Sequence, residues 1–284
     1  MRASTTRGQL AAAATLLRRV ALASLAFVST AGFADARDRC AETAEALQAL
    51  HDGDRYQAAA LLFAAARLGC EAEARALLDR GAAIDARDRE GKTALAKAAE
   101  ADKLPLIRLL LEHGADANAR AVDGSTPLFY AAEQDRGAVV ALLLERGADP
   151  NLPGRKGVRP LAAAAFNGST ESVTELMKFG ADANALDNDG QGAIVYAAGH
   201  GYAPVVALLL QAGVDVNRRY AHGLTALMWA AGSDVSAGVD DVDATIKTLI
   251  EHGAARDLRD DRGKTAANIA HDLGRERAAK LLGR

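Results

Sequence analysis

The sequence predicts an all-α repeat solenoid, because two independent ladders of residues recur along it with one period. The first ladder consists of the residues that begin a recurring cluster of small residues: Ala60, Thr93, Thr126, Arg159, Gly192, Thr225 and Thr265. The second ladder consists of Gly81, Gly114, Gly147, Gly180, Gly213 and Gly253. Every step in both ladders is 33 residues, except the last step, which is 40. An alanine-rich composition alone does not explain why both ladders lengthen their step by seven residues at the same place, so the chain is a repeat protein. The seven members of the first ladder predict about seven repeats with terminal caps.

The clearest copy of the repeat spans residues 123–151, with the sequence DGSTPLFYAAEQDRGAVVALLLERGADPN. Its TPLFYAA segment and its period resemble the ankyrin repeat, whose signature contains T-P-L-H-x-A. The resemblance covers residues 60–284, about four fifths of the chain. It implies helix-turn-helix units joined by β-hairpin-like turns, and it implies the binding of other proteins. The histidine of the family signature is replaced, by Phe129 in this copy.

The local chemistry of this copy agrees with a helix-turn-helix unit. Thr126 can cap the first helix, and Pro127 suits its first position because the missing N–H would have no partner there. Ala131 and Ala132 keep the first helix thin, so a second helix can pack closely against it. Gly147 is expected to end that second helix in a left-handed conformation. One unit cannot bury its own apolar face, so stability is expected from the stacking of neighbours.

Composition and charge exclude several classes of protein. Half of the 284 residues are apolar, which is enough for a large core, and the repeats indicate one solenoid without an internal boundary. The formal net charge of -3 is too small to indicate a nucleic acid or acidic lipid partner. No apolar run reaches 18 residues, so we expect no integral membrane domain. We also expect a monomer.

Residues 1–36 lie outside the repeats and have the layout of a secretory signal peptide. Four arginines precede an apolar segment, residues 20–33, and small residues follow it. Cleavage is expected after Ala31, Ala34 or Ala36. The alternatives are a soluble amphipathic helix over residues 11–17 and an uncleaved anchor. We therefore predict a bacterial exported protein that is periplasmic or secreted once the signal peptide is removed.

Residues 37–59 are predicted to form an N-terminal cap with one helix, which covers the apolar face of the first repeat. The only two cysteines of the chain are Cys40, in this cap, and Cys70, in the first repeat. In an exported protein they can form a disulfide, which on the chain-entropy argument would stabilise the fold by roughly 3–4 kcal/mol. Two separate thiols are the alternative. Neither cysteine lies in a C-x-x-C motif, so the sequence does not indicate a redox enzyme.

Three of the later repeats depart from the pattern. In the fifth repeat, Gly192 replaces the capping threonine, which should weaken the start of the helix. The seven extra residues of the sixth repeat are expected in a loop between its two helices, and residues 240–243 should open the second helix. The last repeat, from Thr265, is degenerate and carries charged residues suited to a terminal cap.

No motif in the sequence indicates catalysis, a metal site or a cofactor. His113 and His252 occupy one position of the repeat, where a cation suits the end of a helix. No H-E-x-x-H, P-loop or G-x-S-x-G is present in the sequence. We therefore expect a protein that is not an enzyme.

A surface remains as the candidate site. In proteins of the ankyrin family, partners usually dock on the concave face, through hairpin tips and the residues after the Ala-Ala pair. Carried over to this chain, the resemblance implies partner binding by Arg89, Glu100, Arg120, Val122, Glu133, Gln134, Arg155, Lys156, Phe166, Asn167, His200, Tyr220 and His222. Phe166 and Tyr220 stand out, since aromatic residues often dominate the energetics of interfaces.

Tyr130, Tyr196 and Trp229 share one position of the repeat, directly before the Ala-Ala pair. They could form part of the core or the wall of a groove, and the sequence leaves both readings open.

The function predicted from the sequence is non-catalytic binding of a protein partner by a rigid concave face that loses little entropy on docking. Two alternatives use the same surface: a secreted effector or inhibitor of a host or competitor protein, and an accessory factor of a periplasmic enzyme.

Overall fold

The computed structural model describes residues 36–51, 53–233 and 239–283. The chain divides into a short unit, residues 1–42, and a main unit, residues 43–284, which holds all the repeats. The predicted signal peptide lies outside the described residues, apart from Ala36. Within the part of the chain that is described, no helix is both long and apolar enough to cross a membrane.

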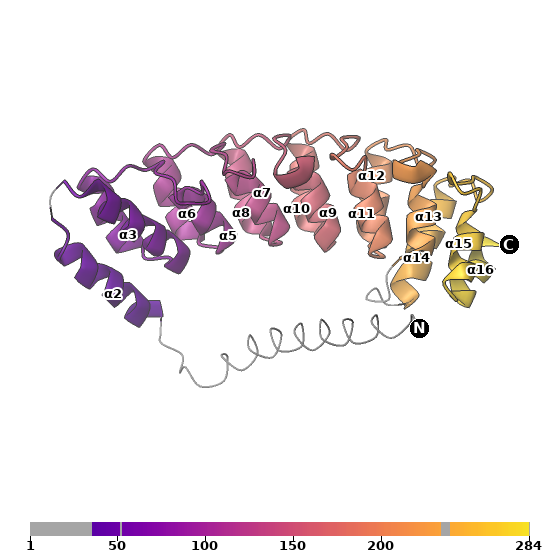
Figure 1. The fold of residues 1–284 in the computed structure, drawn as a ribbon, viewed down its shortest axis with the longest axis horizontal. Coiled ribbons are helices and arrows are strands. Elements are labelled where there is room, and N and C mark those ends of the chain that lie inside the picture. Colours follow the sequence, from indigo (N-terminus) through magenta and orange to yellow (C-terminus); the bar gives the residue numbers. More distant parts are fainter. Residues whose placement is uncertain (1–35, 52, 234–238, 284) are drawn as a thin grey trace, which may run out of the picture. The chain divides into compact units, whose positions relative to one another are not determined.

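Helix α2 (Ala36–Gln48) precedes seven pairs of helices in the described residues (Figure 1). The pairs are α3 and α4 (Arg55–Leu68, Glu71–Asp79), α5 and α6 (Ala94–Glu100, Leu104–Glu112), α7 and α8 (Pro127–Glu133, Gly137–Glu145), α9 and α10 (Pro160–Asn167, Thr170–Lys178), α11 and α12 (Ala193–Gly199, Ala203–Gln211), α13 and α14 (Ala226–Ala231, Val239–Glu251), and α15 and α16 (Ala266–Asp272, Glu276–Leu282). Short 3-10 turns η1 (Arg155–Gly157) and η2 (Ala221–Gly223) lie between pairs. The predicted all-α solenoid with seven repeats is confirmed.

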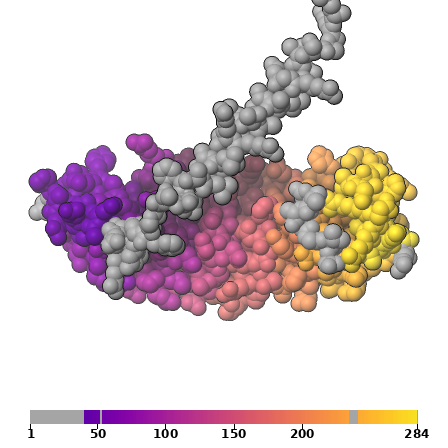
Figure 2. Space-filling view, turned by 90° about the horizontal axis from the view of Figure 1, so that it is seen from below, coloured from indigo at the N-terminus to yellow at the C-terminus, as the bar shows by residue number. Residues whose placement is uncertain are grey.

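The repeats stack in two layers. The first helices pack in sequence, with α5 between α3 and α7 and with α11 between α9 and α13. The second helices do the same, as in α8, α10 and α12. In the space-filling view the repeats follow one another in chain order, from indigo to yellow (Figure 2). Each apolar face is therefore covered by the next repeat, as a solenoid requires.

The clearest copy folds for the reasons expected from its sequence. The Thr126 hydroxyl accepts a hydrogen bond from the Phe129 N–H (3.2 Å) and caps α7. Ala131 and Ala132 are fully buried, and the apolar side of α8 packs behind them. Gly147 has a φ of 86°, where the Cβ of another residue would be strained, and this conformation ends the second helix.

Asparagine side chains bridge successive repeats. The Asn151 amide donates to the Gly180 carbonyl (2.9 Å), and its oxygen accepts from the Asp182 N–H (2.8 Å). Asn118 and Asn217 make the same pair of bonds with the repeats that follow them. These three asparagines therefore fasten the backbone of the following repeat to their own.

The first repeat starts earlier than predicted. Helix α3 begins at Arg55, five residues before Ala60, because the Asp54 carboxylate caps it and accepts from the Gln57 N–H (2.9 Å). Ala60 therefore lies inside a longer helix and does not mark its start. Arg80, at the end of α4, donates to the backbone carbonyls of Leu47 (2.9 Å) and Leu50 (2.8 Å). These bonds tie residues 47–50 to the first repeat.

The fifth and sixth repeats carry the expected irregularities. Gly192 precedes α11 without a side-chain cap, as predicted, because glycine has no side chain to accept the hydrogen bond. Helix α13 ends at Ala231 and α14 begins at Val239, so the extra residues fall between the two helices of the sixth repeat, and residues 234–238 lie outside the described part.

Candidate functional site

One position of the repeat lies at the end of each first helix, and its residue changes along the stack from charged to aromatic to glycine. Residues at this position, 33 apart, are Arg67, Glu100, Glu133, Phe166, Gly199 and Gly232. Glu133 lies beside the tip of the next repeat, since its carboxylate forms an ion pair with Arg155 of η1. Toward the C-terminal repeats the large side chains give way to glycine. This position therefore shapes a surface between the first helices and the tips.

A hollow of about 590 Å³, here called the first hollow, lies on this surface between repeats two and five. The ends of α5, α7 and α9 line it, together with η1 and Tyr196. Its four charged lining residues are Glu100, Glu133, Arg155 and Lys156, so the formal charges cancel.

Most charges of the first hollow are already paired within the protein. Glu133 pairs with Arg155, and Glu100 pairs with Lys92 (Nζ–Oε2 3.0 Å). Partial burial disfavours the charged form of Lys92, but the hydrogen bond and charge of Glu100 outweigh it and raise the pKa of Lys92. Asn167 donates from its amide to the Glu133 carbonyl (2.7 Å), which joins the ends of α7 and α9. These bonds hold the lining in place before any partner arrives.

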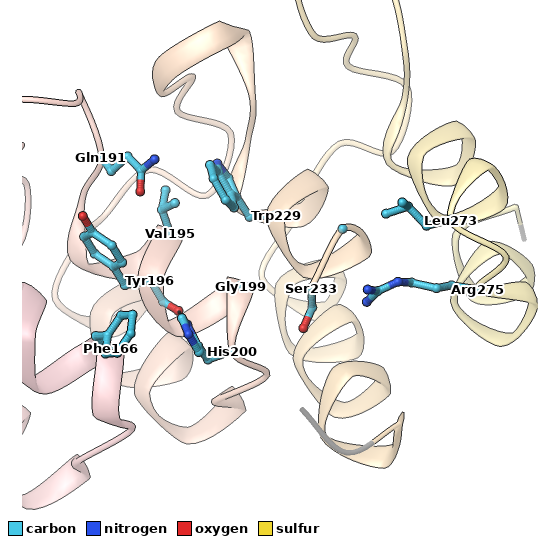
Figure 3. Close-up of a pocket in the computed structure, with 11 residues that line it drawn as sticks. Phe166, Gln191, Val195, Tyr196, Gly199, His200, Trp229, Ser233, Leu273 and Arg275 are labelled. Atoms are coloured by element: carbon cyan, nitrogen blue, oxygen red, sulfur yellow. Dashed lines mark hydrogen bonds between the residues drawn. The ribbon is translucent and has the colours of Figure 1, made fainter. Parts of the chain in front are cut away.

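A second hollow of about 640 Å³ adjoins the first, since Phe166 and Tyr196 line both. Its lining comes from α9, α11, α13 and the last repeat (Figure 3). Gly199 and Gly232 line it where earlier repeats carry Glu100 and Glu133, so the absence of two side chains opens the space. The first and second hollows together are called the groove below.

Aromatic rings form one side of the second hollow (Figure 3). The His200 ring lies 4.4 Å from that of Phe166, and the Tyr196 ring lies 6.0 Å from it, both edge to face. His200 is held by the contact of its Nδ1 with the Tyr196 carbonyl (2.9 Å). Phe166 remains 48% exposed within this cluster.

Tyr196 is held in this cluster by a hydrogen bond of its hydroxyl. Its hydroxyl donates to the Asp187 carboxylate on the neighbouring turn. Burial, together with the Asp187 hydrogen bond and charge, raises the pKa of Tyr196 above its ordinary value. The hydrogen bond to Asp187 fixes the ring, and the raised pKa keeps the phenol protonated into alkaline pH.

The aromatic position left open by the sequence has both roles. Tyr130 is buried, and Lys92 Nζ lies 4.4 Å from the centre of its ring, so it belongs to the core. Tyr196 and Trp229 are half-buried and line the second hollow.

Eight of the thirteen residues implied by the resemblance line the groove. They are Glu100, Glu133, Gln134, Arg155, Lys156, Phe166, Asn167 and His200. Arg89, Arg120, Val122 and His222 lie on exposed tips outside the two hollows. Arg120 fastens one tip to the next, since it donates to the carbonyls of Gly124 (3.1 Å) and Pro153 (3.0 Å).

The expectation for Tyr220 was wrong. Its side chain is only 7% exposed, so it cannot present an aromatic surface to a partner. The ring fills the space beside Gly192, where an added Cβ would lie 3.0 Å from Tyr220 Cε1. The Arg218 guanidinium lies 5.6 Å from its centre. Burial raises the pKa of Tyr220 to about 12.

Residues of the second hollow were missed, above all Gly199, Gly232, Leu273 and Arg275. A signal for the first two was present, because glycine at the position of Glu100 and Phe166 removes the side chain that would fill the groove. Leu273 occupies the position of His200 once the 40-residue step is applied. No sequence signal indicated that Arg275 reaches the same space.

The cysteines lie apart from the groove lining. Neither Cys40 nor Cys70 is a free thiol in the structure, and both are disulfide-bonded.

Two segments of the chain, residues 61–154 and 161–242, match the family model described as ankyrin repeats (3 copies). Together they make up more than half of the chain. Comparison with curated proteins gives no significant match. Ankyrin repeats are generally protein–protein interaction modules. The matched segments and the seven stacked helix pairs together show that the chain belongs to the ankyrin repeat family.

Proposed function

We propose that this protein acts without catalysis, by binding a protein partner in the groove. The observation that carries this proposal is the exposed Phe166 ring, which forms the shared wall of two adjoining hollows. An exposed aromatic ring between two recesses is suited to contact a partner that fills both. Aromatic anchors at the centre of an interface commonly supply a large share of its binding energy.

The groove is also held in its binding shape. Asn167 links two first helices, Asp187 holds Tyr196, and Arg155 is paired with Glu133. A partner that docks here has few side chains to immobilise, and each side chain that need not be ordered saves about 0.5–1.5 kcal/mol on association. The paired charges of the first hollow provide polar contacts around the apolar centre.

The test compares two phenylalanines of the fourth repeat. Phe166 lies in the groove, whereas Phe179 ends α10 on the second-helix layer and is also exposed. Wild-type protein, Phe166→Ala and Phe179→Ala are each used as bait in an envelope extract of the source cell. We expect one partner to be retained by wild type and by Phe179→Ala, and lost with Phe166→Ala. Equal retention by all three baits would overturn the assignment of the groove.

We further propose that the protein is exported, on the basis of the signal-peptide pattern of residues 1–36. The intact mass of protein recovered from the source cell should correspond to a chain that starts after Ala31, Ala34 or Ala36. Alkylation before and after reduction should label two cysteines only after reduction. A full-length chain, or two reactive thiols, would contradict export with a bridge. Fractionation then separates a periplasmic binding protein or enzyme accessory factor from a secreted effector.

A further inference from the structure

We propose that the second hollow selects an acidic side chain, Asp or Glu, next to an apolar residue in an extended segment of the partner. This inference rests on the proposed function, and it adds the chemistry by which the groove recognises its partner.

The second hollow carries a local positive charge. Arg275 is the one formally charged residue in the described lining of the second hollow. The hollow contains no carboxylate in that lining, and no ion pair joins Arg275 to a carboxylate in the described residues. The first hollow differs, because its charges cancel and two of its carboxylates are paired. A positive charge with no ion-pair partner among the described residues favours an anionic group, even though the whole chain is acidic.

Arg275 is placed to bind a carboxylate in the second hollow. Its side chain extends from the last repeat toward Ser233, across the hollow from the aromatic cluster of Phe166, Tyr196 and His200 (Figure 3). The guanidinium can offer two parallel N–H donors to one carboxylate. Leu273, which is 56% exposed, lies next to it on the same side. A carboxylate at Arg275 therefore places its neighbouring residues against apolar surface.

The second hollow has room for a side chain of the partner. A side chain can enter between the two walls because Gly199 and Gly232 leave the floor of the hollow bare. The two hollows share Phe166 and Tyr196, so a segment lying across Phe166 extends into both. A segment that crosses Phe166 and continues beyond Arg275 presents a side chain, and not a chain end, to the guanidinium. The acid is therefore a side-chain carboxylate.

The experiment uses the full-length chain and a phage library of random peptides of about a dozen residues, fused to the coat protein through their C-terminal ends. Such peptides have no free terminal carboxylate. Selections are run with wild type, Arg275→Gln and Lys280→Gln. Lys280 is exposed in the same repeat and does not line the groove, so it matches the loss of one positive charge. Peptides recovered with wild type and Lys280→Gln should be enriched in Asp or Glu beside a large apolar residue.

With Arg275→Gln the acidic enrichment should disappear and the apolar enrichment should remain. A selected peptide, synthesised with a C-terminal amide, should bind Arg275→Gln about tenfold more weakly, and replacing its acid by the amide should have no further effect on that variant. The same acidic enrichment with Arg275→Gln, or none with wild type, would overturn the inference. Phe166→Ala separates the two proposals. If the peptides lose binding to Phe166→Ala but show no acidic preference, only this inference fails. If they bind Phe166→Ala as well as wild type, the groove itself fails.

Discussion

The two hollows are built on the same repeats but offer a partner different surfaces. In the first hollow, Glu133 projects from the end of its helix and is neutralised by Arg155. In the second hollow, Gly199 occupies the equivalent position, and Arg275 has no carboxylate in the described lining. The comparison shows how a solenoid can vary recognition at constant fold. The buried alanines and leucines set the walls, while one exposed position per repeat decides whether the space is filled, paired or open.

The largest expected effect comes from closing the second hollow. Gly199→Glu restores the side chain that Glu100 and Glu133 carry in earlier repeats. An added Cβ at Gly199 lies 3.7 Å from Trp229 Cε3, an ordinary contact, and the position has no left-handed φ. We expect the partner, or a selected peptide, to bind more than about tenfold more weakly, because the new side chain blocks the hollow. The melting temperature should not fall, since glycine is a weak helix former. Isothermal titration and thermal unfolding measure the two effects, and undiminished affinity would contradict the role of the second hollow.

The next effect concerns Tyr130 and Tyr196, which share one position of the repeat. The Tyr196 hydroxyl is bonded to Asp187, whereas the Tyr130 hydroxyl lies 3.4 Å from Asp123 Oδ1, near the limit of a hydrogen bond. Tyr196→Phe should lower the free energy of unfolding by about 1.5 kcal/mol, the value of a bond to a charged group. Tyr130→Phe should lower it by about 0.5 kcal/mol or less, since a long bond contributes less. Urea unfolding of both variants checks the difference, which equal losses would refute.

A smaller effect is expected from making the first hollow resemble the second. Glu133→Gln removes the partner of Arg155 and leaves the first hollow with a net positive lining. Peptides rich in Asp and Glu should then bind about two- to fivefold more tightly, because exposed ion pairs contribute little each. Glu145→Gln, an exposed position at the end of α8, serves as the control for the change of charge. An equal gain in the control would show a general effect of net charge and not an effect of the groove.

The smallest effect is a loss of folding stability that appears only in alkali, when the Tyr220 phenol ionises. Burial raises the pKa of Tyr220 to about 12, while in the unfolded chain the phenol should titrate near 10. Both states hold the neutral phenol below pH 10, so this contribution to stability is complete there and is lost as the pH rises from 10 through 12. Denaturant midpoints should therefore fall across that window. Tyr220→Phe should flatten the fall, and an unchanged profile would mean that the ring is not buried.

The fold could be predicted from the sequence because every repeat restates the same local chemistry. The 33-residue spacing, the capping threonines and the buried alanines all indicate one unit, and the structure confirms it. The prediction of the fold was incomplete where a residue outside the repeat pattern determines the structure. Helix α3 starts at Arg55 because Asp54 supplies a cap outside the threonine ladder. The bonds of Asn151 to the following repeat were not predicted, since they depend on a neighbour that one repeat cannot show.

The groove was only partly predictable, for a related reason. Phe166 and Glu133 could be placed from their position after the alanine pair. Tyr220 was misplaced because a tip residue turns inward when the neighbouring repeat has glycine at 192. Arg275 was missed because its approach to α13 depends on how the last repeat stacks. Side chains that follow a repeat position are visible in the sequence, whereas those directed by contacts between repeats are not.

The most direct measurement places a photo-reactive benzophenone amino acid at position 166 or at position 179 of the full-length chain, expressed in the source cell. Irradiation should produce a covalent adduct with a second protein from position 166 and none from position 179. Gly199→Glu, combined with the probe at 166, should reduce that adduct. An adduct of equal yield from both positions, or none from position 166, would contradict the claim that this groove binds the partner.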